Sequence, residues 1–156
     1  MIEFIIHEMM KKIYFDTCAI QRPLDDKSQL RIYLESEAVL ALLRLIEESQ
    51  IEWISSNILD FEIAYISDPI RKIMIQDILS LVSKTVQTTS TTKTLAEQII
   101  QEGITALDAA HVAIAIEHKI DYFCTADDKL LKKIKKSAIV KSMRCLSPLE
   151  LVEELT

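Results

Sequence analysis

The chain is poor in the residues that interrupt regular structure. Its 156 residues include one glycine and three prolines, far fewer than collagen-like or linker-rich proteins contain. A hydrophobic fraction of 49% beside 27% charged residues also excludes an intrinsically disordered chain. Because this length suits one domain of ordinary size, we expect a single helix-rich domain over residues 1–156.

Cysteine is also scarce, and long apolar runs are absent. Cys18, Cys124 and Cys145 form neither a CxxC pair nor an even set for disulfides, which favours a reducing, cytoplasmic location. No stretch approaches the roughly 18 apolar residues of a membrane-spanning helix. The opening MIEFIIHEMM lacks the basic start of a signal peptide. Since the sequence from Met10 reads like a natural start, residues 1–9 are predicted to be a dispensable extension.

Charge is unevenly distributed along the chain. The net charge is -6, from 18 basic and 24 acidic residues, so bulk attraction to nucleic acid is not expected. The stretch 129–144 nevertheless holds seven basic residues and no acidic one, which leaves -6 - 7 = -13 for the remainder. A polyanion would have to meet this stretch, unless it is only a solvated helix face.

Short apolar segments alternate with amphipathic ones. The predicted strands are Lys12–Phe15, Ile51–Ser55, Tyr122–Cys124 and Ala138–Val140. The predicted helices are residues 29–49, a helix capped by Ser56 or Asn57, and segments beginning at Pro69, Leu95, Thr105, Asp127 or Asp128, and Pro148. Residues 84–94 fit a strand or a loop equally well. This alternation predicts a parallel sheet with right-handed crossovers.

Four acidic residues follow or adjoin the predicted strands. Asp16 ends the first strand, Glu62 lies early in the helix after the second, Asp108 begins an alanine-rich helix, and Asp127 follows the third strand. Each has an ordinary explanation when taken alone. Asp108 and Asp127 could complement helix dipoles, Asp16 could close a turn, and Glu62 could be a surface acid. Together they are expected at the carboxyl edge of the sheet, where active sites of this architecture lie.

Carboxylates gathered at one edge repel one another unless a cation or protons compensate them. Oxygen ligands without paired histidine or cysteine favour Mg²⁺ or Mn²⁺ over zinc. Such ions take further ligands from phosphates, which suggests phosphoryl chemistry.

Four motifs around these acids resemble those of the PIN-domain ribonuclease family. They are YFDTC, SNILDFE, GITALDAAHVAIA and YFCTADDKLL. The resemblance runs from about Lys12 to the SPLELVEEL tail, and QRPLDD resembles a loop of one PIN subgroup. It implies a flavodoxin-like α/β fold with a central parallel sheet of four to five strands surrounded by helices. It also implies metal-dependent hydrolysis of RNA, with Asp16, Glu62, Asp108 and Asp127 as catalytic and metal-binding residues. The chain further resembles VapC-type toxins, which implies an antitoxin partner.

Further residues are assigned supporting roles, each beside a simpler alternative. Thr17 and Thr125 are expected to support the acids unless they only form turns or caps, and Asp128 either caps its helix or holds a water at the metal. Cys18 and Cys124 are interpreted as small buried thiols, and His111 as a packing residue rather than a ligand. The predicted RNA contacts are Arg22, Lys132, Lys133, Lys135 and Lys136.

Three other functions compete with the nuclease hypothesis. A phosphoacceptor receiver needs an acidic pair after its first strand, but Asp16 stands between Phe15 and Thr17. A haloacid-type phosphatase needs a D-x-D motif there, and Cys18 replaces its second acid. A non-catalytic metal- or RNA-binding PIN-like protein remains as the third.

Self-association is expected from the helix over residues 29–49. It carries two apolar stripes, so a homodimer would bury the second one, with Leu43 as a candidate outward-facing contact. Core burial on both sides is the alternative.

Overall fold

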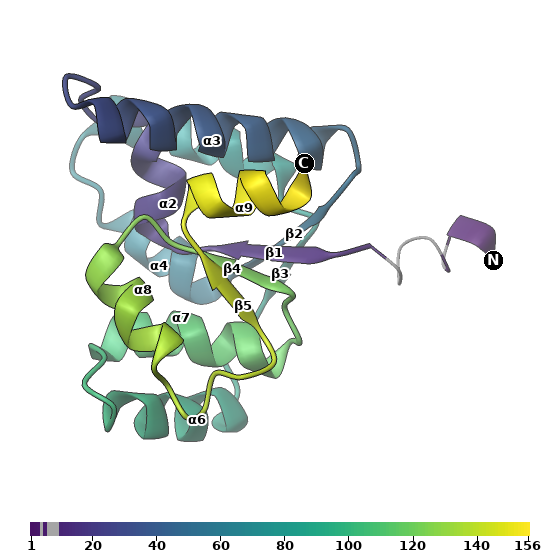
Figure 1. Ribbon diagram of the computed structural model, residues 1–156, viewed down its shortest axis with the longest axis vertical. Coiled ribbons are helices and arrows are strands. Elements are labelled where there is room, and N and C mark those ends of the chain that lie inside the picture. The colour runs from purple at the N-terminus through teal and green to yellow at the C-terminus, as the bar shows by residue number, and fades with distance from the viewer. Residues whose placement is uncertain (4, 6–9) are drawn as a thin grey trace.

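Five short parallel strands form the centre of the fold. The computed structural model describes residues 1–3, 5 and 10–156; the prediction for residues 1–9 concerns mostly residues outside this description. The strands lie in the order β3-β2-β1-β4-β5, with the bounds β1 Lys12–Phe15, β2 Glu52–Ser56, β3 Lys84–Val86, β4 Tyr122–Cys124 and β5 Arg144–Leu146. This confirms the predicted α/β class with a parallel sheet (Figure 1).

Helices cover both faces of this sheet. The bounds of the helices are α2 Thr17–Gln21, α3 Leu30–Glu47, α4 Asn57–Ala64, α5 Pro69–Ile78, α6 Ser90–Ile100, α7 Ala106–Glu117, α8 Asp128–Lys135 and α9 Pro148–Leu155, with 3-10 turns η1 Arg22–Leu24 and η2 Leu79–Leu81. In Figure 1, α3 and α9 lie above the sheet, whereas α6 and α7 lie below it. The predicted layers are therefore present.

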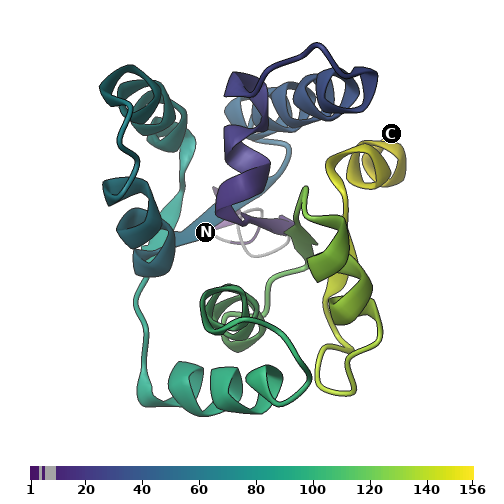
Figure 2. The same cartoon turned by 90° about the vertical axis from the view of Figure 1, so that its left-hand side faces the viewer.

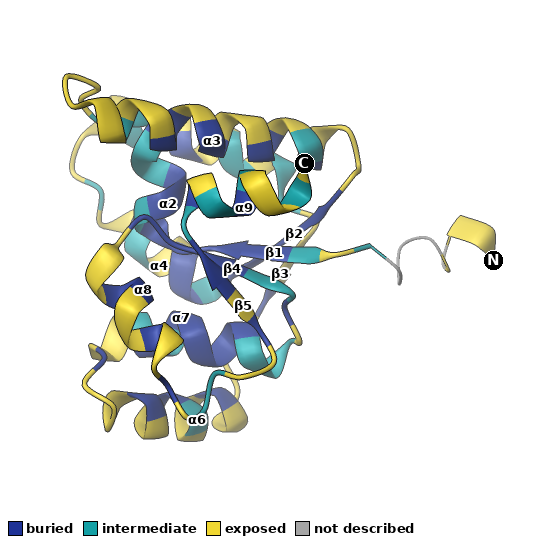
Figure 3. Ribbon diagram, in the orientation of Figure 1, coloured by how far each residue is buried: buried dark blue, intermediate teal, exposed yellow. Residues whose placement is uncertain are grey.

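Alternation along each strand divides the core into two clusters. Ile13 and Phe15 pack with α3, α5 and α9 on one face, and Tyr14 packs with α6 and α7 on the other. Trp53 and Ile54 of β2 divide in the same way. Figure 3 shows the strands and α7 largely buried, while the outward side of α3 is exposed. Each strand thus contributes to two hydrophobic layers, as expected for a covered parallel sheet.

Two predicted elements are wrong or shifted. The segment Ala138–Val140 is not a strand, and the last strand is Arg144–Leu146. The helix expected from Leu95 begins at Ser90, because Thr89 and Thr92 form a reciprocal capping box. That helix does end before Gly103, whose φ of 88° lies in the left-handed region that favours glycine.

The long helix α3 is more deeply covered than its sequence suggests. Leu43 is only 6% exposed, so the prediction that it faces outward is wrong. The outward apolar residues of α3 are instead Leu30, Tyr33, Leu34 and Leu40. In the part of the chain that the structure describes, no helix is both long and apolar enough to span a membrane.

Candidate functional site

The carboxyl ends of β1 and β4 lie side by side where the strand order reverses. The chain proceeds outward from β1 through β2 to β3, and then returns to the other side of β1 with β4. Open parallel sheets bind their ligands in the crevice at such a switch point. Figure 2 looks onto this edge of the molecule, around which α2, α7 and α8 gather.

Asp16 is the buried centre of this crevice. It directly follows β1 and caps α2, since its Oδ1 accepts a hydrogen bond of 3.0 Å from the Ala19 amide. Its Oδ2 accepts a second one of 2.5 Å from the hydroxyl of Thr125. The Cys18 thiol lies 3.2 Å from Oδ1, and Asp16 is only 4% exposed. Both of its oxygens are therefore fixed by the chain.

Thr125 links Asp16 to the second acid of the crevice. While its hydroxyl donates to Asp16, its Oγ1 accepts a hydrogen bond of 3.0 Å from the Asp127 amide. Asp127 in turn caps α8, accepting hydrogen bonds from the amides of Lys129 and Leu130 at 3.0 and 3.1 Å. Thr125 thus hydrogen bonds to both Asp16 and the backbone of Asp127.

Glu62 is held by a histidine that the sequence analysis discounted. The Nε2 atom of buried His111 hydrogen bonds to Glu62. Its Nδ1 lies 2.5 Å from the hydroxyl of Tyr14, which lies 2.7 Å from Oγ of Ser56. Ser56 also caps α4 by accepting from the Leu59 amide. A continuous hydrogen-bonded chain therefore runs from the end of β2 through β1 and α7 to Glu62.

The protonation states of Glu62 and Tyr14 determine where the hydrogens lie along this series of hydrogen bonds. Burial alone would raise the pKa of Glu62, but the hydrogen bond and charge of His111 lower it below the ordinary value. An ionised carboxylate only accepts hydrogen bonds, so Nε2 of His111 carries the hydrogen. Burial raises the pKa of Tyr14 far above its usual range, so its phenol stays protonated. Glu62 is therefore kept both charged and oriented.

Asp108 lies in the first turn of α7. The hydroxyl of Thr105 donates to Asp108 at 3.0 Å, but the Thr105 side chain does not cap the backbone of α7. Burial raises the pKa of Asp108, and the charges of Asp127 and Glu62 raise it further. Asp108 also shares a small pocket with Asp127; its other lining residues are Ile104, Thr105, Lys129, Leu130 and Lys133.

The donor chemistry of the crevice fits a hard divalent cation. Burial raises the pKa of Asp16 to about 6, although hydrogen bonds from Thr125 and Cys18 act in the opposite direction. Burial is the main cause of the raised pKa at both Asp16 and Asp108, and a bound cation would favour their charged forms. Among the described residues, no three His, Cys, Asp or Glu side chains converge into a ready coordination cluster. Asp16 is turned toward Thr125 and Glu62 toward His111.

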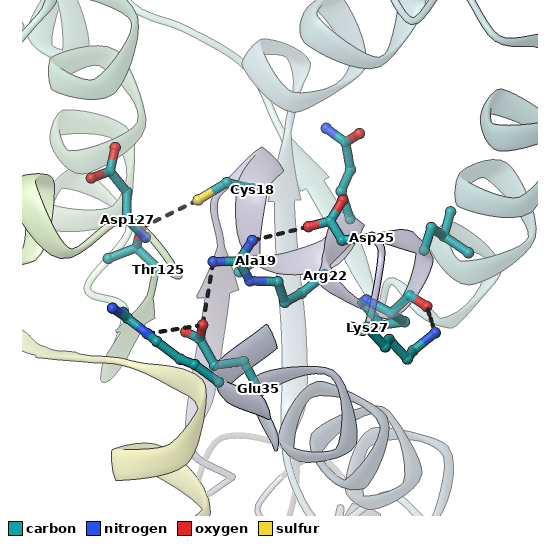
Figure 4. Close-up of polar contacts among 12 residues, drawn as sticks. Cys18, Ala19, Arg22, Asp25, Lys27, Glu35, Thr125 and Asp127 are labelled. Carbon is teal, nitrogen blue, oxygen red and sulfur yellow. Dashed lines mark hydrogen bonds and ion pairs between the residues drawn. The ribbon is translucent and has the colours of Figure 1, made fainter. Parts of the chain in front are cut away.

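Arg22 lies in a network of ion pairs rather than free in the crevice. Its guanidinium donates to Asp25 at 3.0 Å and to buried Glu35 at 3.2 Å (Figure 4). Arg71 of α5 also binds Asp25 and the carbonyl of Leu24. The loop that contains the RPLDD sequence is thereby tied to α3 and α5.

Asp128 does not cap α8, because Asp127 occupies that position. It is exposed and binds Arg31, whose hydrogen bond lowers the pKa of Asp128. Thr17 is buried beside Glu62 and contributes to lowering its pKa.

The basic side chains of α8 point in different directions. Lys135 pairs with Glu150 at 3.1 Å, and Lys133 donates to the carbonyl of Gly103 at 2.9 Å. Lys132 and Lys136 are exposed. Cys18 is partly buried, whereas Cys124 and Cys145 are buried, and all three are free.

Sequence reasoning missed Tyr14 and His111 as parts of this site. Two spacings in the sequence carried the signal. Tyr14 precedes Asp16 by two residues, and His111 follows Asp108 by three on one helix. Periodicity places each pair on a common side, but it does not reveal that the two side chains meet across the sheet.

Removing the Tyr14 hydroxyl tests the hydrogen-bonded chain. Tyr14→Phe leaves His111 Nδ1 buried without its partner, so the free energy of unfolding should fall by about 1–3 kcal/mol in urea titrations. Tyr65→Phe is the control because Tyr65 is 75% exposed, and it should change stability by less than about 0.5 kcal/mol. Equal effects of the two changes would contradict the role of the hydroxyl.

The raised pKa of Asp16 predicts a pH-dependent stability in EDTA. Its native pKa of about 6 exceeds the ordinary 3.8, so the native state holds the proton more tightly than the unfolded state. The stabilisation of the native state by protonated Asp16 is complete below about pH 4 and is lost as the pH rises through about 6. Between the unfolded and native pKa values, the unfolding free energy falls by roughly 1.4 kcal/mol for each pH unit. The unfolding free energy should therefore decline between about pH 4 and about pH 6.5 and level off above that.

Asp16→Asn should flatten this decline and raise the melting temperature in EDTA at the upper pH. The oxygen of asparagine can still cap α2, and its amide can donate to the Thr125 hydroxyl that Asp16 accepts from, so the change removes the charge while a contact with Thr125 is kept. The control is Asp77→Asn, which removes an exposed charge from α5 and should leave the decline unchanged. A lower melting temperature for Asp16→Asn would instead identify Asp16 as a structural turn residue.

Comparisons with known proteins agree with this geometry. A family model described as the PIN domain matches residues 13–136. The structure resembles PAE2754 from Pyrobaculum aerophilum, with a TM-score of 0.56 and 15% identity over 94% of this chain and 98% of that one. It also resembles VapBC2 from Rickettsia felis bound to a DNA fragment from their promoter, with a TM-score of 0.56 and 14% identity over 87% and 98% of the two chains.

At such identities these two structures support the fold alone, and no curated protein sequence matches the chain. The family match is independent of them and covers most of the strands and all four acids of the crevice. From its sequence, sheet order and crevice together, the chain belongs to the PIN domain family.

Proposed function

We propose that this protein is a divalent-metal-dependent endoribonuclease. Members of the PIN domain family are generally nucleases, which supports hydrolysis of nucleic acid. The observation that carries the proposal is the set of four carboxylates around the switch-point crevice, two of which have raised pKa values. A divalent cation would compensate such a set, and a phosphodiester would supply the remaining oxygen ligands.

Asp16, Glu62, Asp108 and Asp127 are the residues that would hold Mg²⁺ or Mn²⁺. When bound, the cation supplies Lewis-acid chemistry for phosphodiester hydrolysis. The chain itself fixes Asp16 through Thr125 and keeps Glu62 ionised through His111. In the reaction, water attacks phosphorus and one P–O bond breaks, which leaves a phosphate monoester on one product and a hydroxyl on the other.

Cleavage of single-stranded or structured RNA tests the proposal directly. The purified protein should cleave RNA with Mg²⁺ or Mn²⁺ and lose this activity in EDTA. Asp16→Asn and Asp108→Asn should each reduce the rate at least about 100-fold, since each removes an oxygen ligand and a charge at the crevice. Asp77→Asn should cleave like the wild-type protein.

Cleavage that survives both EDTA and Asp16→Asn would contradict the proposal. A protein that binds Mn²⁺ and RNA without cleaving it would instead support the alternative of a non-catalytic PIN-like binding protein. Stabilisation by added Mn²⁺ in thermal scans, reduced in Asp16→Asn, reports binding separately from turnover.

An antitoxin protein and a second copy of the chain are the proposed partners. The antitoxin is suggested by the likeness to VapBC2, in a cytoplasmic toxin-antitoxin pair. The homodimer is suggested by the exposed apolar residues of α3, among which Leu30 is 71% exposed. Exposed apolar side chains on one helix are common at sites of association.

Light scattering tests the homodimer. The wild-type protein should have twice the monomer mass at high micromolar concentration, whereas Tyr33→Lys with Leu34→Lys should be monomeric because charge would be buried at the contact. The control is Ile100→Lys on α6, on the opposite side of the sheet. A monomeric wild-type protein would show that α3 serves the core alone.

A further inference from the structure

The lysines of α8 fall into two groups that differ in what they face. The helix is seated by buried Leu130, Leu131 and Ile134, which fixes its rotation about its own axis. Lys129 and Lys133 are four residues apart and therefore lie on one side of it. Lys132 and Lys136 form a second pair with the same spacing, displaced from the first pair by about 60° around the helix axis.

Of these two pairs, the first borders the pocket described above. Lys129 and Lys133 line the pocket that contains Asp108 and Asp127, and the second pair does not. The ammonium group of Lys133 donates to the carbonyl of Gly103 at 2.9 Å, which holds this side chain across the loop between α6 and α7. Lys132 lies on the side of Asp128. The hydrogen bond from Arg31 is the main cause of the lowered pKa of Asp128, and the charge of Lys132 lowers that pKa further. Lys135 is occupied by Glu150.

The pocket combines two charges that need different partners. Within the described part of the chain, no ion pair joins Lys129 or Lys133 to Asp108 or Asp127. The carboxylates are suited to a cation and the ammonium groups to an anion. A phosphate of a nucleic-acid backbone satisfies both, because it contacts ammonium groups directly and carboxylates through a cation.

We propose that Lys129 and Lys133 form the phosphate-binding side of this pocket and hold the backbone of single-stranded RNA beside Asp108 and Asp127. This inference rests on the proposed nuclease function. It revises the sequence-based assignment, which included Lys132, Lys135 and Lys136 as contacts and omitted Lys129. The affinity for RNA is thus assigned to Lys129 and Lys133 on one side of α8, and not to the total positive charge of the helix.

Two double variants with equal charge test the inference. Binding of a labelled single-stranded RNA oligonucleotide is measured by fluorescence anisotropy over a range of KCl concentrations, in EDTA and again with Ca²⁺ in place of the catalytic metal. Lys129→Gln with Lys133→Gln should lower the slope of log affinity against log salt by about 1.4, corresponding to two lost contacts with a single strand. Lys132→Gln with Lys136→Gln should leave most of the slope intact.

Among the residues that the structure describes, the Lys129 side chain has no hydrogen-bond partner. Lys129→Gln alone therefore keeps the test independent of folding, and its slope should fall by about 0.7. In cleavage assays with Mn²⁺, the Lys129 and Lys133 double variant should raise KM more than it lowers kcat. Equal slopes for the two double variants, a larger loss from the control pair, or no RNA binding by the wild-type protein would overturn the inference. Absence of metal-dependent cleavage together with a lysine-dependent slope would overturn the nuclease function and leave this binding side in place.

Discussion

The hydrogen bond between Thr125 and Asp16 is the interaction on which the crevice depends. It gives a buried carboxylate a donor that water cannot supply at 4% exposure. The same hydroxyl accepts from the Asp127 amide, so the position of Asp16 and the first turn of α8 are set together. The strand pairing of β1 with β4 brings these groups into reach. The positions of Asp16, Asp127, the first turn of α8 and the lysines of that helix are therefore set together.

The strands and the four acids could be read from the sequence because they depend on local patterns. Buried runs such as KIYF end at a polar residue, and the carboxyl ends of parallel strands meet at one edge. The last strand could not be distinguished in this way. Ala138–Val140 is as apolar as the true strand Arg144–Leu146, and three residues show no period. Pairing with β4 selects the second segment.

The contacts of His111 and Arg22 could not be predicted from the sequence, because they join segments that are separated along the chain. A histidine beside alanines on an apolar helix resembles an ordinary core residue, until Tyr14 and Glu62 are placed on either side of it. Arg22 resembles a phosphate contact until Asp25 and Glu35 are seen to occupy its guanidinium. The rotation of α8, which separates its lysines, is likewise set by packing and not by composition.

The separation of 109 residues between Asp16 and Thr125 has a consequence for synthesis. Contacts this distant in sequence form late, because closing a long loop costs entropy before the contact rewards it. A nascent chain that has emerged through β3 can pair β1 with β2, but Asp16 then has neither its donor nor the neighbouring Asp127. Asp16 therefore lacks its hydrogen-bond donor until the chain has been synthesised beyond β4. The order of the strands delays the site until β4 has left the ribosome.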